Sequence, residues 1–351
     1  MKNGKIGVGF IGCGYIAAKK HLPLTAGDRH CEIVSLYSRS RGRAEECQRL
    51  FGGLDTRVAA SAEELLSDER VDLIIISTPN DTHAEYSIAA LSSGHDVVCE
   101  KPMAVNSADA ENMLRCAEEN HRFLHISYQN RFSKQAQFAK QMADSGALGE
   151  MYYARALALR RRALPNWGSC STSAHQGGGP LIDIGSHALD LAMWLTGSYE
   201  LDYVAGFTSD YIARRGSSAN RWGSWETARV DVEDFAAGFV RMKNGVVINV
   251  EASYALNSST EAEAAADVFG SDGGLELRRD GLTYIHELDG KIASERLFSG
   301  SGEPNEAEHE FIVHKLLAGD RSCEAANQAL AVCKAVEALY ASAASGKPVC
   351  F

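Results

Sequence analysis

The stretch KIGVGFIGCGYIA, residues 5–17, decides the fold of this 351-residue chain. It leads from an apolar run rich in β-branched residues into a G-x-G-x-x-A turn made by Gly12, Gly14 and Ala17. In such a turn the first glycine permits a tight bend, and the second lets backbone N–H groups approach a pyrophosphate. The small third residue lets the following helix pack on the strand, so the pattern predicts a helix N-terminus that faces phosphates.

Apolar strand patterns and helical patterns alternate after this turn. The expected strands are Glu32–Tyr37, Val71–Ser77, Asp96–Cys99 and Phe123–Tyr128. The expected helices are Arg41–Phe51, Thr82–Ser93 and Ser107–Asn120, and Ser61–Glu64 has the form of a capping box. This alternation predicts an α/β Rossmann domain, in which a doubly wound parallel sheet binds its ligand beyond the carboxyl ends of the strands.

The pattern changes character near residue 128, which predicts a Rossmann domain over 1–128 and an α+β domain over 129–351. The second domain offers strands without regular intervening helices, at Glu150–Leu159, Leu201–Thr208, Asp234–Met242, Val246–Ser253, Ala262–Phe269, Leu275–Arg278 and Leu282–His286. Asn244 and Gly245 favour a hairpin turn. We expect a mainly antiparallel sheet covered by helices at Ile184–Thr196, Asn305–Ala318 and Ala325–Ser345.

Composition narrows the class of protein. The formal net charge of -11 argues against general affinity for nucleic acid, and no apolar run has the length of a bilayer span. The nine cysteines contain no C-x-x-C pair, so we expect reduced thiols and no structural metal. The first strand follows the N-terminus closely and leaves no room for a signal peptide, which predicts a cytoplasmic location.

Four motifs in order carry a family resemblance. They are Gly12-x-Gly14-x-x-Ala17, Ser77-Thr78-Pro79-Asn80 with His83, Glu100-Lys101-Pro102, and the run from Gly177 to His187, GGGPLIDIGSH. The chain resembles the Gfo/Idh/MocA family, the relatives of glucose-fructose oxidoreductase and inositol dehydrogenase. The resemblance spans nearly the whole chain. It implies an open-faced sheet in the second domain, pairing through that sheet as homodimers or homotetramers, and NAD(P)-dependent hydride transfer at a secondary alcohol or ketone of a sugar, cyclitol or sugar derivative.

Three residues are the candidate catalytic groups. Lys101 follows an apolar strand, and the resemblance implies that its ammonium binds the reacting oxygen; Glu100 before it can hold that ammonium. Asp183 and His187 are four apart on a helix that begins near Pro180, so they share one helix face. We expect His187 to act as general base and Asp183 to orient the substrate hydroxyl or the imidazole. Each residue also has an alternative interpretation. Lys101 would be a solvated surface charge, Asp183 would interact with the helix dipole, and His187 would be packed in the core.

Cofactor contacts are expected at the carboxyl ends of the predicted strands: Gly12, Gly14, Tyr15, Ile16, Ser38, Arg39, Arg43, Thr78, Pro79, Asn80, His83, Glu100 and Lys101. The acid that would bond the ribose 2'-hydroxyl of NAD is absent after the second strand, where Ser38, Arg39 and Arg43 stand. A hydroxyl and arginines suit a 2'-phosphate, which favours NADP over NAD. Stacking on adenine, or simple exposure at the start of a helix, would explain the same arginines.

Substrate contacts are expected from Tyr128, Arg161, Trp167, Asp183 and His187, with the loop Arg160–Gln176 setting specificity. Trp167 offers a flat platform for a sugar ring, and Tyr128 and Arg161 can bond its hydroxyls. Packing is the competing explanation for each. Asp183, His187 and Asp190 share a helix face, yet two carboxylates and one histidine on one helix seldom converge on an ion, so no metal is expected.

Two other functions compete with the dehydrogenase. A protein of this fold can bind NAD(P) as a regulator without catalysis, against which Lys101, Asp183 and His187 argue. An NAD-dependent glycoside-cleaving enzyme would oxidise its sugar only transiently. The resemblance implies that family members with this activity carry a Tyr-x-x-His segment, where this chain has Ile184-Gly185-Ser186-His187.

Overall fold

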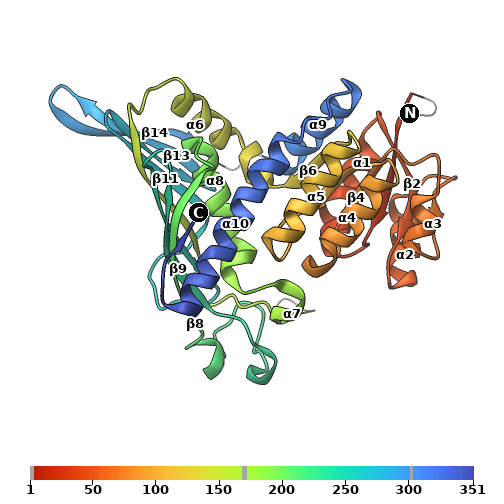
Figure 1. Cartoon of the computed structure of the whole chain (residues 1–351), viewed down its shortest axis with the longest axis horizontal. Helices are drawn as coiled ribbons and strands as arrows, with labels where there is room; N and C mark the ends of the chain where they lie inside the picture. The colour runs from red at the N-terminus through yellow and green to blue at the C-terminus, as the bar shows by residue number, and fades with distance from the viewer. Residues whose placement is uncertain (1–3, 168–171, 301–302) are drawn as a thin grey trace. The chain divides into compact units, whose positions relative to one another are not determined.

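The computed structural model describes residues 4–167, 172–300 and 303–351 (Figure 1). The described chain forms two compact units. The first extends to Ser127 and takes in Asn305–Leu330, and the second comprises Tyr128–Pro304 and Ala331–Phe351. We expect residues 305–330 in the second domain, whereas in the structure this segment packs with the first unit.

A parallel six-stranded sheet forms the centre of the first unit, with strand order β3-β2-β1-β4-β5-β6. The strands are β1 (Ile6–Ile11), β2 (Cys31–Tyr37), β3 (Arg57–Val58), β4 (Leu73–Ile76), β5 (Asp96–Glu100) and β6 (Leu124–Ser127). The helices are α1 (Leu22–Gly27), α2 (Arg41–Phe51), α3 (Ala62–Leu66), α4 (His83–Ser92), α5 (Ser107–Glu119) and α9 (Pro304–Leu317). The strand order reverses between β1 and β4, which is where a doubly wound sheet binds its ligand. The predicted Rossmann fold is confirmed.

Alternate side chains of the strands explain why α9 belongs to this unit. Val8 and Ile75 point to one face of the sheet and form a core with Ile312, Val313 and Leu316 of α9. The expectation that this helix covers the second sheet is therefore wrong. Helical periodicity reveals an apolar face, but it does not say which sheet that face covers.

A nine-stranded sheet dominates the second unit, in the order β14-β13-β12-β11-β7-β10-β9-β8-β15. Its strands are β7 (Met151–Leu159), β8 (Leu201–Ser209), β9 (Phe235–Met242), β10 (Val247–Ser253), β11 (Ala262–Gly270), β12 (Gly273–Arg278), β13 (Gly281–Leu288), β14 (Lys291–Ser299) and β15 (Val349–Cys350). Among the described strands of this sheet, only β7 and β10 pair in parallel, so the sheet is mainly antiparallel as expected. The predicted Asn-Gly hairpin joins β9 to β10, with Gly245 at a φ of 94°.

Helices cover one face of this sheet, as Figure 1 shows for α6 (Lys134–Asp144), α8 (Ser186–Thr196) and the second half of α10 (Glu324–Ser345). Small residues permit the close packing. Ala154, Ala156 and Ala158 of β7 are fully buried, in a strand against which α8 packs. Side chains that alternate with the buried positions, among them Phe207 and Phe239, remain exposed on the opposite face. Helix α6 and strands β14 and β15 were not predicted, because their sequences are too polar or too short to stand out.

Candidate functional site

The glycine-rich turn has the geometry that its sequence predicts. Gly12 has a φ of 100°, and a Cβ there would lie 2.5 Å from the backbone oxygen of Ser77, so only glycine fits. A Cβ on Gly14 would meet open space, while Ala17 is fully buried where the helix packs. Tyr15 and Ile16 are exposed at the start of that helix. Open space beside Gly14 and an exposed helix N-terminus fit a dinucleotide pyrophosphate.

The end of β2 carries the residues expected to select the cofactor. Ser38 is half-buried, and Arg39 and Arg43 are exposed. Arg41, which lies between them in the sequence, forms an ion pair with Glu45 at 2.8 Å. Two exposed arginines and a hydroxyl at this strand end are compatible with a 2'-phosphate.

The loop after β4 is bonded to the glycine turn. The Ser77 hydroxyl donates to the Gly12 carbonyl at 3.0 Å, and the Thr82 hydroxyl donates to the Thr78 hydroxyl at 2.8 Å. Pro79 and Asn80, between them, are half-buried. Thr78, Pro79 and Asn80 thus lie at the carboxyl edge of the sheet, where a cofactor is expected.

His83, one of the expected cofactor contacts, is buried at the same edge of the sheet. It is 1% exposed, its Nδ1 lies 2.8 Å from the Pro102 carbonyl oxygen, and its Nε2 lies 3.1 Å from that of Thr78. Burial lowers the pKa of His83, which favours the neutral imidazole. This side chain links two loops of the edge, so we interpret it as a positioning residue.

Lys101 is half-buried directly after β5, and its peptide bond to Pro102 is cis. The structure gives Glu100, expected to hold the Lys101 ammonium, two other partners. Its Oε1 atom lies 3.0 Å from Lys20 Nζ and 2.8 Å from His21 Nε2. Burial opposes ionisation, but Lys20 and His21 hold the pKa of Glu100 well below its ordinary value.

This ion pair extends into a buried network. Lys20 also contacts Glu308 of α9 at 2.9 Å, and Glu308 lies 3.1 Å from Nε2 of His125 on β6. The network joins the helix after the glycine turn to the strand that ends before Lys101. Sequence reasoning missed it, because Lys20 and Glu308 are far apart in the chain and each resembles an ordinary surface charge.

In the second unit, Asp183 and His187 lie on consecutive turns. A π-helical turn, η4 (Leu181–Gly185), leads directly into α8 and carries Asp183, whereas we expected a regular helix. Such turns are frequent at functional sites. The Tyr254 hydroxyl donates to Oδ2 of Asp183 at 2.7 Å, and the buried Tyr128 ring meets the His187 ring edge-on, with centroids 5.8 Å apart.

Tyr254 is a residue that sequence reasoning missed. It is completely buried, and burial together with the Asp183 carboxylate raises its pKa well above the ordinary value. The hydroxyl therefore keeps its proton and donates it in the hydrogen bond. Tyr254 follows the predicted strand Val246–Ser253 directly, and nothing in the local pattern marks it.

A carboxylate holds the start of the π-helical turn. Glu233 accepts hydrogen bonds from the backbone N–H groups of Gly179 and Leu181, at 2.8 and 3.2 Å, and from the Tyr340 hydroxyl at 2.7 Å. A Cβ on Gly178 would lie 2.2 Å from the Tyr340 hydroxyl oxygen, and one on Gly179 would lie 2.3 Å from the Glu233 backbone oxygen. The glycine run thus lets Glu233 and Tyr340 approach the turn that carries Asp183.

Asp190 is fully buried and accepts two hydrogen bonds from Arg131, at 2.8 and 2.5 Å. This bidentate pair holds α8 to the start of the unit. Arg131 occupies both oxygens of the Asp190 carboxylate. Asp190 is therefore not available as a ligand for a metal site with Asp183 and His187.

Among the residues that the structure describes, one group has the proximity of a metal site, namely Asp28, Cys31 and His309. His309 Nε2 lies 3.1 Å from Oδ2 of Asp28. Burial, reinforced by Asp28, raises the pKa of the Cys31 thiol to about 12. A protonated thiol is a poor metal ligand, so we interpret this group as a packed hydrogen-bonded cluster.

The expected substrate residues lie in different environments. Tyr128 is 4% exposed and packs on His187, whereas Arg161 is exposed beyond the end of β7. Trp167 is 49% exposed and meets Trp222 edge-on, with ring centroids 4.7 Å apart. The specificity loop Arg160–Gln176 includes positions 168–171, which lie outside the described residues.

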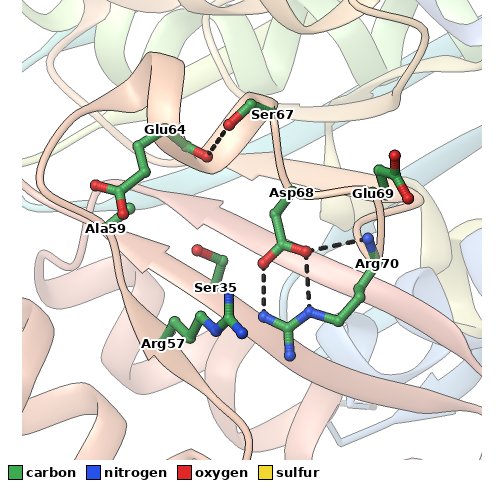
Figure 2. Close-up of a pocket in the computed structure, with 8 residues that line it drawn as sticks. All are labelled: Ser35, Arg57, Ala59, Glu64, Ser67, Asp68, Glu69 and Arg70. Atoms are coloured by element: carbon green, nitrogen blue, oxygen red, sulfur yellow. Dashed lines mark hydrogen bonds and ion pairs between the residues drawn. The ribbon is translucent and has the colours of Figure 1, made fainter.

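A polar hollow in the first unit is shown in Figure 2. Asp68 and Arg70 lie there with carboxylate and guanidinium facing each other, 2.9 and 2.6 Å apart in their two side-chain contacts. Ser35, Arg57 and Glu64 line the same hollow. None of the predicted site residues contributes to it. The Asp68–Arg70 pair stabilises the turn before β4.

Comparison with known proteins identifies the family. Residues 6–128 match the model described as "Oxidoreductase family, NAD-binding Rossmann fold", and residues 136–276 match the GFO/IDH/MocA C-terminal domain. A D-glucoside 3-dehydrogenase of Escherichia coli is 30% identical over 277 residues, which are 79% of this chain and 78% of that protein. The chain belongs to the GFO/IDH/MocA family of oxidoreductases, and the predicted resemblance is confirmed.

Other relatives share this extent of similarity. A levoglucosan dehydrogenase of Pseudarthrobacter phenanthrenivorans is 27% identical, covering 82% of this chain and 76% of that protein. An inositol 2-dehydrogenase of Acidothermus cellulolyticus is 29% identical, covering 77% and 72%. The solved structure of a levoglucosan dehydrogenase in complex with NADH and levoglucosan superposes with a TM-score of 0.86 at 21% identity, over 99% of each chain. That superposition shows the common fold.

The helices were also compared with the requirements of a membrane span. Within residues 4–167, 172–300 and 303–351, no helix combines the length and the apolar character that crossing a bilayer requires.

Proposed function

We propose that this protein is an NAD(P)-dependent dehydrogenase that oxidises a secondary hydroxyl group of a sugar, cyclitol or sugar derivative, or reduces the corresponding ketone. The observation that carries the proposal is the 2.7 Å hydrogen bond from Tyr254 to Asp183, which holds this carboxylate one turn before His187. Relatives that act, by their names, on a glucoside, levoglucosan and inositol support the substrate class.

The nicotinamide cofactor, when bound, supplies the hydride acceptor or donor. We propose that Gly12, Gly14, Tyr15 and Ile16 hold its pyrophosphate, and that Thr78, Pro79 and Asn80 contact its nicotinamide end. We favour NADP over NAD, because Ser38, Arg39 and Arg43 offer a hydroxyl and two exposed guanidinium groups where an acid would otherwise bond the ribose.

The chemistry assigned to the protein is proton transfer and charge stabilisation. In the proposed mechanism the Lys101 ammonium donates a hydrogen bond to the reacting oxygen and stabilises negative charge on it. The His187 imidazole accepts the hydroxyl proton during oxidation and returns it during reduction. Asp183, held by Tyr254, orients the substrate hydroxyl or the imidazole, and the Tyr128 ring restricts His187 from its edge.

The first experiment is an absorbance assay of nicotinamide reduction with NADP or NAD and a panel of sugars, inositols, sugar acids and anhydrosugars. We expect turnover with at least one member of the panel. Lys101→Ala and His187→Ala should each lower kcat by about 10²–10⁴-fold while cofactor affinity is nearly unchanged, because these groups act on the reacting oxygen. Lys243→Ala, in the exposed β9–β10 turn, is the matched control.

Three results would argue against this mechanism. Near-normal turnover in either active-site variant would remove that residue from the site. Tight cofactor binding without turnover across the panel would favour a regulatory protein. Release of an aglycone without net cofactor reduction would favour a glycoside-cleaving enzyme.

The proposal also includes a homodimer or homotetramer formed through the open face of the nine-stranded sheet, where Phe207 and Phe239 are 56% and 52% exposed. A cytoplasmic location, where a diffusible nicotinamide cofactor is available, completes it. Cell fractionation tests the location.

A further inference from the structure

A second hollow, in the second unit, contains one residue expected to contact the substrate, Arg161, and none of the residues to which a step of the reaction is assigned. Its volume is about 720 Å³, and its lining includes Arg161, Arg162, Arg221, Asn257, Ser259 and Glu261. The protein as a whole has a formal net charge of -11. Three guanidinium groups around one hollow of an acidic protein therefore mark a local excess of positive charge.

The ion pairs around the hollow do not neutralise this excess of positive charge. Glu261 is the carboxylate of the lining, and it accepts from Arg221 at 3.1 and 3.3 Å. Arg162 donates to two neutral acceptors, the Arg161 carbonyl at 2.6 Å and the Asn257 amide oxygen at 2.5 Å. Glu263, which is not in the lining, lies 3.0 Å from Arg160 and 3.5 Å from Arg221.

The backbone that presents these arginines is held on both sides. The Arg161 N–H donates to Glu261 at 3.2 Å, and the Arg161 carbonyl accepts from the Leu256 N–H at 2.9 Å. Arg162 forms an isolated bridge with Ala255. Guanidinium groups on a fixed backbone recognise a phosphate or carboxylate with less loss of conformational entropy than mobile ones.

The lining of the hollow includes a residue that is close in sequence to Tyr254, the donor to Asp183. Leu256 in its lining is two positions after Tyr254, and an extended chain advances at most about 3.6 Å per residue. Aromatic rings lie beside it as well, since Arg221 sits over the Trp222 ring at 5.8 Å and Trp222 meets Trp167. Cationic groups and aromatic rings therefore lie on the segment of chain that leads away from Tyr254, the hydrogen-bond donor to Asp183.

We propose that this hollow binds the anionic group of a charged sugar substrate, a phosphate or a carboxylate, while the ring hydroxyl of the same sugar reaches Asp183. The link to Asp183 rests on the proposed function; the binding of the anion does not.

The test is calorimetric titration of the full-length protein with glucose, glucose 6-phosphate and glucuronate at low and at high salt. We expect at least one charged sugar to bind tenfold or more tightly than glucose at low salt, with an advantage that shrinks as salt screens the arginines. The double variant Arg162→Gln, Arg221→Gln should reduce the ratio of charged to neutral affinity at least tenfold. Arg214→Gln, which removes an exposed arginine paired with Asp210, is the matched control and should keep the ratio.

Glucose 6-phosphate and glucuronate distinguish a phosphate from a carboxylate as the recognised group. Affinities for both that are no better than for glucose, or a preference that survives in the double variant, would overturn the proposal. These outcomes are separable from the fate of the dehydrogenase. If a charged sugar binds preferentially but is not turned over, the anion site is supported and the dehydrogenase activity is contradicted. If only neutral sugars are turned over and no charged sugar binds preferentially, the dehydrogenase activity is supported and the anion site is contradicted.

Discussion

Asp183 shows how a single residue depends on its partners. A carboxylate on the first turns of a helix would ordinarily interact with the helix dipole and solvent. Here a fully buried tyrosine donates to it, and a half-buried carboxylate, Glu233, holds the turn that carries it. Both partners lie more than 45 positions away in the sequence. These contacts restrict the orientation of the Asp183 carboxylate, as the proposed proton transfer would require.

Tyr254→Phe tests this orientation directly. The substitution removes the donor to Asp183 and keeps the packed ring, so we expect kcat to fall about tenfold, as for the loss of one hydrogen bond to a charged group. Thermal unfolding should change little. Steady-state kinetics on the substrate found in the panel give the measurement, with Tyr211→Phe at an exposed position as control. An unchanged kcat would show that Asp183 needs no such support.

Arg39→Ala tests the choice of cofactor. A guanidinium that pairs with a 2'-phosphate contributes only when the phosphate is present. We therefore expect the affinity for NADP to fall tenfold or more and the affinity for NAD to change less than about twofold. Fluorescence titration with each cofactor gives both constants, and Arg49→Ala, exposed farther along α2, is the control. Equal losses for NAD and NADP would remove the argument for a 2'-phosphate.

At the scale of elements, the buried network ties together four pieces of the first unit. Lys20 lies in the helix after the glycine turn, Glu100 ends β5, His125 lies in β6, and Glu308 belongs to α9. Its charged groups are each less than 9% exposed, so their desolvation is offset only by pairing with one another. We infer that the network holds the glycine turn and the strand before Lys101 in register.

Glu308→Ala should lower the free energy of unfolding by about 3–5 kcal/mol, because it leaves Lys20 and His125 buried without this carboxylate. Glu310→Ala, exposed on the same helix, should change it by less than about 0.5 kcal/mol. Urea unfolding of wild type and both variants measures the difference. A small effect of Glu308→Ala would mean that water or a rearranged Glu100 replaces the lost carboxylate.

The same network has a defined pH window. Burial opposes ionisation of Glu308, but Lys20 lowers its pKa below the ordinary value near 4.5. Its contribution is therefore complete above about pH 4.5 and is lost as the pH falls through the lower folded pKa. Burial likewise opposes the charge on Lys20, whose pKa the two carboxylates raise from 10.5 to about 12, so its contribution is complete below about pH 10.5 and is lost as the pH rises from there through the folded pKa. The stability gap between wild type and Glu308→Ala should be steady between these limits and narrow outside them.

At the scale of the whole molecule, the nine-stranded sheet has one covered and one open face. On the covered face Gly206 and Gly238 stand opposite each other, and a Cβ on either would lie within 2.4 Å of Leu339 of α10. On the open face, Phe207 and Phe239 are about half exposed. An apolar surface of this kind on a sheet is typical of an interface between subunits.

Phe207→Glu combined with Phe239→Glu should convert an oligomer into monomers, because four like charges would meet across a symmetric dimer interface. Light scattering on a sizing column gives the mass of each species. Leu54→Glu, at a fully exposed position of the first unit, is the control and should keep the wild-type mass. A monomeric wild-type protein, or an oligomer that survives both charges, would contradict pairing through this face.

The sequence by itself determined the Rossmann fold and several residues of the candidate site. Strand and helix periodicity, the glycine turn and the Asn-Gly hairpin are local patterns, and the chain realises them within a residue or two: Arg41–Phe51 was predicted to the residue. Gly12, Lys101, Asp183 and His187 stood out because glycine spacing, strand ends and helical spacing can be read along the chain.

Only the tertiary structure decided which distant side chains meet. The assignment of α9 to the first sheet, the pairing of Lys20 with Glu308, the hydrogen bond from Tyr254 to Asp183 and the arginine-lined hollow join residues separated by tens to hundreds of positions. Local pattern carries no information about such contacts, since the free energy that selects them comes from burial, charge pairing and packing in the folded chain.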